Sequence, residues 1–267
     1  MRPDGRAAVT FDLWYTLVRL DAHAQDRYLA RQIELAVEAL SSAPREPGAR
    51  TDHPGREELR RAVEEQRRAA GPAAEEGRTL NVTQQLDRAG RALGLRPSPQ
   101  DYLHALDQEV RSLPFATAPG AEKVLEQLHE EGYRLGVVSN TVGERGSALR
   151  AVLEVLRLSS FLDTTVFSDE LPWTKPEPRI FQRALDILEV GPDRVLHVGD
   201  GWSDLEGARR AGLRGAVLFT GLRAYSSGYR SLLPAGDQVS LHADHEVERF
   251  SEVPALVHAL LPLNDGR

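Results

Sequence analysis

The sequence contains no cysteine among its 267 residues. Disulfides, thiolate metal sites and cysteine nucleophiles are therefore excluded. Lysine is almost absent as well: Lys123 and Lys175 are the only two, and arginine supplies the other basic side chains. Because arginine is preferred so strongly, each remaining lysine is a candidate for a specific role.

Long apolar runs and an excess of positive charge are also missing. No stretch approaches the ~20 apolar residues of a membrane-spanning helix, and residues 1–5 lack the apolar region of a signal peptide. The net charge of -7 argues against a nucleic acid partner, because a phosphate backbone requires a basic surface. We therefore expect a soluble cytoplasmic protein that binds neither nucleic acid nor membrane. Its oligomeric state stays open.

The stretch 7–17 has the first pattern that indicates a site. Residues 7–11 are mostly small or apolar, which is typical of a buried strand in a parallel sheet. Asp12 follows directly, at the edge where open parallel sheets bind ligands. It is a candidate nucleophile or metal ligand, although turns also favour aspartate.

Residues 19–115 show helical periodicity and no strand pattern. Helices are predicted over 21–40, 57–70, 80–93 and 98–113. The pair at 71–72, Gly-Pro, is predicted to end the second of them. We expect a helical cap domain over 19–115, inserted into a core domain made of 1–18 and 116–267.

From residue 116 onward, strands and helices alternate. Strands are predicted over 133–138, 165–167, 194–198, 215–219 and 244–247. Helices are predicted over 121–131, 144–156, 178–189, 204–211 and 253–260. Such alternation predicts an α/β fold with a doubly wound, Rossmann-like parallel sheet and right-handed crossovers.

Polar residues gather at the predicted carboxyl edge of this sheet. Ser139-Asn140 ends one strand, Asp200 ends another, and Asp204 begins the helix after it. Lys175 precedes a further helix. Carboxylates beside an ammonium suit a phosphorylated substrate, since one carboxylate can attack phosphorus while Mg²⁺ and lysine offset the negative charge.

Four segments carry a family resemblance. They are residues 11–17, 137–140, 175–181 and 199–204. In order and in predicted place they resemble the motifs of the haloacid dehalogenase-like (HAD) hydrolase superfamily, with a helical cap between the first two. The resemblance covers about residues 6–18 and 116–220. Four motifs in the right order are a specific signal, whereas one alone is weak.

The resemblance implies roles for residues around the transferring group. Asp12 would be the nucleophile and would form a covalent aspartyl intermediate. Thr16, Ser139 and Lys175 would bind the transferring group, with Asn140 nearby.

The resemblance also implies a Mg²⁺ site. Asp12 and Asp200 would bind the ion directly, and Asp204 would bind or support it. The backbone carbonyl of Trp14 would complete the protein ligands.

Trp14 departs from the pattern of the family phosphatases, which usually have aspartate there as general acid and base. Indole can do neither, and this loss costs ~10²–10⁴ in rate. A cap residue could act as the acid instead, or the substrate could carry a good leaving group, as acyl phosphates and activated phosphonates do. Family 2-haloacid dehalogenases have an aromatic residue at this position and need no metal.

Asp200 and Asp204 favour the phosphatase interpretation, because two carboxylates are costly to bury. The first hypothesis is a Mg²⁺-dependent phosphatase that acts on a small phosphorylated metabolite. The alternatives are a metal-independent 2-haloacid dehalogenase and a catalytically weak HAD-fold binding or regulatory protein. His197, inside a predicted strand, is interpreted as a core histidine with satisfied hydrogen bonds.

Overall fold

A parallel sheet organises the computed structural model of the chain, which describes residues 6–49, 52–225 and 243–263. Residues 1–5, on which the expectation about a signal peptide rests, lie outside these ranges. Within the described residues the sheet has six strands in the order β5-β4-β1-β6-β7-β8. The strands are β1 (Ala8–Phe11), β4 (Arg134–Ser139), β5 (Thr164–Phe167), β6 (Val195–Gly199), β7 (Gly215–Phe219) and β8 (His245–Val247).

Strand β1 lies between β4 and β6 and is completely buried, as its apolar sequence predicts. Phe11 is in register with Val137 of β4 and Val198 of β6. The backbone N–H of Asp12 continues the ladder by donating to the carbonyl of Val198 at 2.8 Å. The three strands therefore end together, which brings the polar residues after them to one edge.

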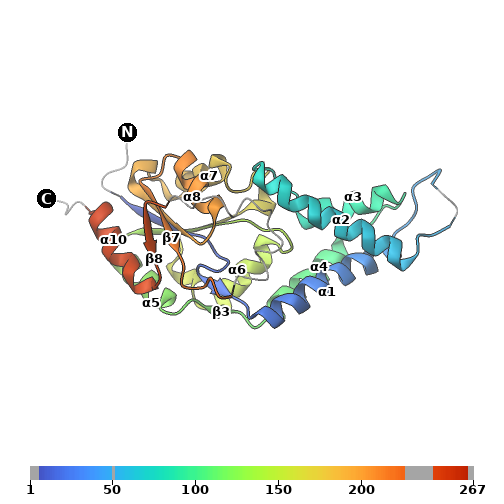
Figure 1. Ribbon diagram of the computed structural model, residues 1–267, viewed down its shortest axis with the longest axis horizontal. Helices are drawn as coiled ribbons and strands as arrows, with labels where there is room; N and C mark the ends of the chain where they lie inside the picture. The colour runs from blue at the N-terminus through green and yellow to red at the C-terminus, as the bar shows by residue number, and fades with distance from the viewer. Residues whose placement is uncertain (1–5, 50–51, 226–242, 264–267) are drawn as a thin grey trace.

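Helices cover both faces of the sheet (Figure 1). One face packs against α5 (Ala121–Glu130), α6 (Gly146–Val155) and α10 (Val253–Leu260). The other packs against α7 (Pro178–Leu188) and α8 (Trp202–Arg210). The predicted α/β class with a doubly wound parallel sheet is confirmed.

The chain leaves and re-enters the sheet region through two short paired strands. These are β2 (Val18–Arg19) and β3 (Ala116–Thr117), which pair antiparallel. Between them lie α1 (Ala22–Ser41), α2 (Arg56–Glu75), α3 (Val82–Ala92) and α4 (Pro99–Ser112), which form the elongated part of the molecule in Figure 1. We keep the name cap for these helices. The domain boundaries at 18–19 and 115–116 stay a prediction.

Several predicted helix limits were wrong by two residues or more: α3 begins at residue 82 rather than 80, and α8 at residue 202 rather than 204. Helix α2 runs through Pro72 to Glu75, because Ala70 and Ala73 are buried against Leu80 and hold the last turn in place. Helix α6 begins at residue 146 rather than 144, so that Glu144 belongs to the preceding loop. Among the described helices, none has the length and apolar character needed to cross a bilayer.

Candidate active site

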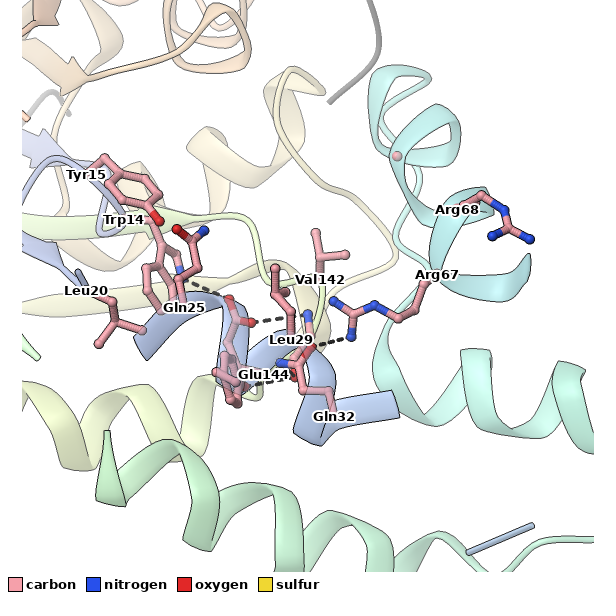
Figure 2. Close-up of a pocket in the computed structure, with 13 residues that line it drawn as sticks. Trp14, Tyr15, Leu20, Gln25, Leu29, Gln32, Arg67, Arg68, Val142 and Glu144 are labelled. Carbon is pink, nitrogen blue, oxygen red and sulfur yellow. Dashed lines mark hydrogen bonds between the residues drawn. The ribbon is translucent and has the colours of Figure 1, made fainter. Parts of the chain in front are cut away.

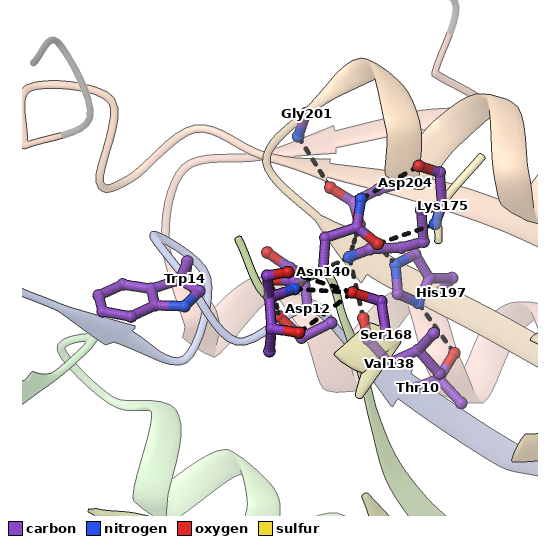
Figure 3. A network of polar contacts seen from close by, with 12 residues as sticks. Thr10, Asp12, Trp14, Val138, Asn140, Ser168, Lys175, His197, Gly201 and Asp204 are labelled. Atoms are coloured by element: carbon purple, nitrogen blue, oxygen red, sulfur yellow. Dashed lines mark hydrogen bonds and ion pairs between the residues drawn. The ribbon is translucent and has the colours of Figure 1, made fainter. Parts of the chain in front are cut away.

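A buried lysine joins two aspartates at the carboxyl edge of the sheet (Figure 3). The Nζ atom of Lys175 donates to Asp12 Oδ1 and to Asp204 Oδ1, each at 2.5 Å, and to the carbonyl of Val138 at 2.9 Å. Only 2% of the Lys175 side chain is exposed. An ammonium ion with three oxygen acceptors is fully satisfied, so the lysine is held rigidly between the two carboxylates.

Asp204 is held from several sides. Its Oδ1 atom lies 3.1 Å from His197 Nε2, and its Oδ2 accepts the backbone N–H of Gly201 at 3.1 Å. Residue 204 is the third residue of α8, so this second bond also caps the helix. A Cβ atom on Gly199 would lie 2.3 Å from Asp204 Cγ. Glycine is therefore required at the end of β6 for Asp204 to lie over it.

His197 extends this network into the core. Its Nδ1 atom lies 2.9 Å from the hydroxyl of Thr10, and its ring is fully buried. Burial lowers its pKa, and the opposing effect of Asp204 does not offset this. His197 has partners at both ring nitrogens, as interpreted from the sequence. It also orients Asp204, which the sequence did not show.

The charges in the cluster shift each other's pKa values. Burial raises the pKa of Asp12, and the attraction of Lys175 does not fully offset it. Burial also acts on Asp204, but Lys175 and His197 outweigh it and hold the pKa of Asp204 well below its usual range. Lys175 keeps a raised pKa because its two carboxylate partners outweigh its burial. Asp204 and Lys175 are therefore ionised at neutral pH.

Asp200 completes a group of three carboxylates. One oxygen from each of Asp12, Asp200 and Asp204 lies within 4.8 Å of the others. Lysine supplies a single positive charge to this group, which leaves an excess of negative charge. Oxygen donors with such an excess fit a hard divalent cation such as Mg²⁺.

The residues predicted to bind the transferring group have different surroundings. The Asn140 side chain accepts from the backbone N–H of Lys175 at 2.8 Å and donates to its carbonyl at 3.0 Å, which fixes the segment that carries the lysine. Ser139 is 1% exposed, and its hydroxyl lies 3.5 Å from the carbonyl of Asn140. The Thr16 hydroxyl is fully buried and has no hydrogen-bond partner within the described residues.

The Trp14 side chain points away from the carboxylates (Figure 3). Its Nε1 atom donates to Glu144 Oε1 at 2.8 Å, and its ring packs 5.4 Å from the ring of Phe115. The second oxygen of Glu144 accepts the backbone N–H of Gly143 at 3.1 Å. Burial raises the pKa of Glu144 to about 7. Sequence reasoning missed Glu144 because it assigned the residue to a helix; its position just after the second motif was the available signal.

Comparison with known proteins agrees with this architecture. The fold and the charged sheet edge are those of an α/β enzyme of the hydrolase class, and the model of a haloacid dehalogenase-like hydrolase family matches residues 7–212. The chain belongs to the haloacid dehalogenase-like hydrolases.

The chain spans about half the length of the curated relatives it matches. The chain is similar to a phosphoglycolate phosphatase of Aquifex aeolicus, with 33% identity over 132 residues, which are 49% of this chain and 61% of that protein. A HAD phosphatase structure from Thermococcus onnurineus has a TM-score of 0.61 at 21% identity and covers 96% of this chain and 99% of that one. A dehalogenase structure with an intermediate complex has a TM-score of 0.54 at 25% identity, and covers 95% and 98%.

Proposed function

We propose that this protein is a Mg²⁺-dependent phosphatase that acts on a small phosphorylated metabolite through an aspartyl-phosphate on Asp12. One observation carries the proposal: Asp12 lies 2.5 Å from the buried ammonium of Lys175, within a group of three carboxylates. A phosphatase from A. aeolicus is among the relatives. Two carboxylates besides the nucleophile would oppose an anionic haloacid, but they suit a cation that accompanies phosphate.

Asp12 supplies the attacking atom. Its Oδ1 is bound to Lys175, which leaves Oδ2 to form the bond to phosphorus as the bond from phosphorus to the leaving oxygen breaks. The leaving group departs with the electron pair of that bond. Water then attacks the aspartyl-phosphate, which releases inorganic phosphate and restores the carboxylate of Asp12. Lys175 keeps Asp12 in one orientation and offsets its charge as the phosphoryl group approaches.

The metal would be held by Asp12, Asp200 and the backbone carbonyl of Trp14. Asp204 is engaged by Lys175, His197 and a backbone N–H, so it supports the site instead of giving up an oxygen. When bound, Mg²⁺ would reduce the repulsion between an anionic substrate and the carboxylates. The buried hydroxyl of Thr16, which has no partner in the described part of the chain, is available to bind a phosphate oxygen.

Trp14 leaves the leaving group without a proton donor at the usual place. Its indole N–H is bonded to Glu144 and carries no acidic proton. Of the two alternatives, a cap residue as acid or a leaving group that is stable as an anion, we adopt the second. Such a leaving group avoids the loss of rate that a site without general acid catalysis otherwise has.

Phosphate release from acetyl phosphate tests the proposal, because acetate needs no protonation to leave. The purified protein should release phosphate with Mg²⁺, lose the activity in EDTA and regain it when Mg²⁺ is restored. Asp12→Asn should abolish turnover, while the exposed Asp26→Asn serves as a matched control. Full activity in EDTA, or turnover by Asp12→Asn, would contradict the proposal.

A 2-haloacid dehalogenase is the second candidate. The aromatic residue at position 14 favours it, and a dehalogenase structure at 25% identity is similar over 95% of the chain. In this case Asp12 would displace halide from carbon without a metal. Halide release from 2-chloropropionate in EDTA would support this function, and no release at high enzyme concentration would remove it.

A further inference from the structure

A cavity of about 140 Å³ lies between the cap and the loop that contains Glu144 (Figure 2). Its apolar lining includes Trp14, Leu20, Leu29 and Val142. An engineered cavity of about 150 Å³ lined by apolar side chains accepts benzene. The cavity therefore has room for one six-membered ring with a small substituent.

Most polar groups around the cavity are bonded within the protein. The Tyr28 hydroxyl and the Gln32 Nε2 atom both donate to the carbonyl of Gly143, at 3.1 and 2.7 Å. Arg67 donates to the Gln32 side-chain oxygen. The two oxygens of Glu144 accept from an indole and a backbone N–H. These bonds fix the positions of the side chains that form the walls.

Gln25 differs from them. It lies on α1, lines the cavity and is only 5% exposed. Its Oε1 atom is buried and accepts no hydrogen bond from any residue in the described ranges. A buried acceptor without a partner is unfavourable, and native structures rarely keep one unless a ligand or water supplies the donor. Gln25 is therefore a residue of the cavity wall whose hydrogen bonding is incomplete within the described residues.

Tyr15 belongs to the part of the cavity wall that is nearest to Asp12 along the chain. It lines the cavity, is 2% exposed and has a left-handed backbone with φ of 56°. Trp14 and Tyr15 follow Asp12 by two and three residues, so this wall continues directly from the loop that carries the nucleophile. A left-handed non-glycine residue is strained, and such strain is common where a side chain must have one position.

We propose that this cavity binds the ring of a small aryl phosphate, with the phosphorus at Asp12 and a hydroxyl or amino substituent of the ring donating to Gln25 Oε1. The inference rests on the proposed phosphatase function and names its substrate class. Three observations carry it: a cavity the size of one ring, aromatic walls formed by Trp14 and Tyr15, and a buried acceptor on Gln25 that has no partner among the described residues. An aryl leaving group also departs without protonation more readily than an alkoxide does, because a phenol is more acidic than an alcohol.

Filling the cavity tests the position of the ring. Leu29 is half-buried and lines the cavity, whereas Ile33 is half-buried one turn further along α1 and does not. Leu29→Trp fills the cavity from α1, and Val142→Phe fills it from the loop that contains Glu144. Ile33→Trp is the control. Initial rates are measured with phenyl phosphate and with acetyl phosphate, whose leaving group has no ring.

The ratio of kcat/KM for phenyl phosphate to that for acetyl phosphate is the readout. Burial of one ring predicts a fall of about tenfold or more in this ratio for Leu29→Trp and Val142→Phe, and no change for Ile33→Trp. A ratio unchanged in both cavity variants would overturn the inference. If the wild-type protein hydrolyses acetyl phosphate but not phenyl phosphate, the inference fails and the proposed function stands. If it hydrolyses neither, the proposed function fails.

Gln25→Leu tests the donor. Among 2-, 3- and 4-hydroxyphenyl phosphates, one isomer should exceed phenyl phosphate in kcat/KM, and Gln25→Leu should remove that preference. We expect an advantage of about tenfold from one well-placed hydrogen bond. If no isomer is preferred, or if the preference survives in Gln25→Leu, Gln25 does not orient the substrate.

Discussion

Glu144 gives the sharpest test of the structure around the cap, because its carboxyl group is buried and its pKa is raised to about 7. The change is Glu144→Gln. Glutamine keeps the size of the side chain and an oxygen that can accept from Trp14 Nε1, but it cannot ionise. The variant removes one titration, and it also loses the hydrogen bond from the N–H of Gly143, because the NH2 group of glutamine cannot accept it. That loss does not depend on pH, so the change of stability with pH still reports the titration of Glu144.

The direction in which stability changes with pH follows from the pKa of Glu144 in the folded and unfolded chain. The ordinary pKa of glutamate is 4.5, and burial raises that of Glu144 to about 7. Between these values the folded protein holds a proton that the unfolded chain has lost, so stability falls as the pH rises through this range. Each pKa unit corresponds to ~1.4 kcal/mol. The free energy of unfolding of the wild type should fall by about 2–3 kcal/mol from pH 5 to pH 8 through this group alone.

Urea unfolding at pH 5, 6, 7 and 8 in EDTA measures this effect. The difference in unfolding free energy between the wild type and Glu144→Gln should change by about 2–3 kcal/mol across the series. The exposed Glu130→Gln on α5 serves as the control and should show a constant difference. A constant difference for Glu144→Gln as well would refute the reasoning, since it would mean that Glu144 has the same pKa folded and unfolded.

Two further predictions concern the charged cluster. Lys175→Met leaves the carboxylates of Asp12 and Asp204 buried without their cation, so the free energy of unfolding in EDTA should fall by about 3–5 kcal/mol; Lys123→Met, which removes the only other lysine from an exposed position, should have little effect. Gly199→Ala places a Cβ atom 2.3 Å from Asp204 Cγ, and overpacking of this kind costs about 1–3 kcal/mol. Circular dichroism melting should show the loss, whereas Gly55→Ala, which meets nothing within 4 Å, is the control.

Much of the fold could be predicted from local patterns. Helical periodicity located α1, α3 and α4, and apolar runs located the strands of the sheet, because both patterns reflect which side chains are buried. The prediction that Gly71-Pro72 ends a helix was wrong, since the packing of Ala70 and Ala73 outweighs the missing N–H of proline. Local propensity is a weak prior wherever tertiary contacts hold a turn in place.

The sequence by itself determined the class of the protein and its charged edge. Parallel strands end on the same side of a sheet, so the sequence predicts that Asp12 and Asp200 meet at one edge. The motif order of the family resemblance adds Lys175 to them. The tertiary structure alone decided their partners. It showed that Lys175 joins Asp12 to Asp204 and that Trp14 donates to Glu144. It also showed that Trp14 and Glu144 line a cavity. These contacts join residues as far as 163 positions apart, and a pattern of neighbouring residues contains no information about them.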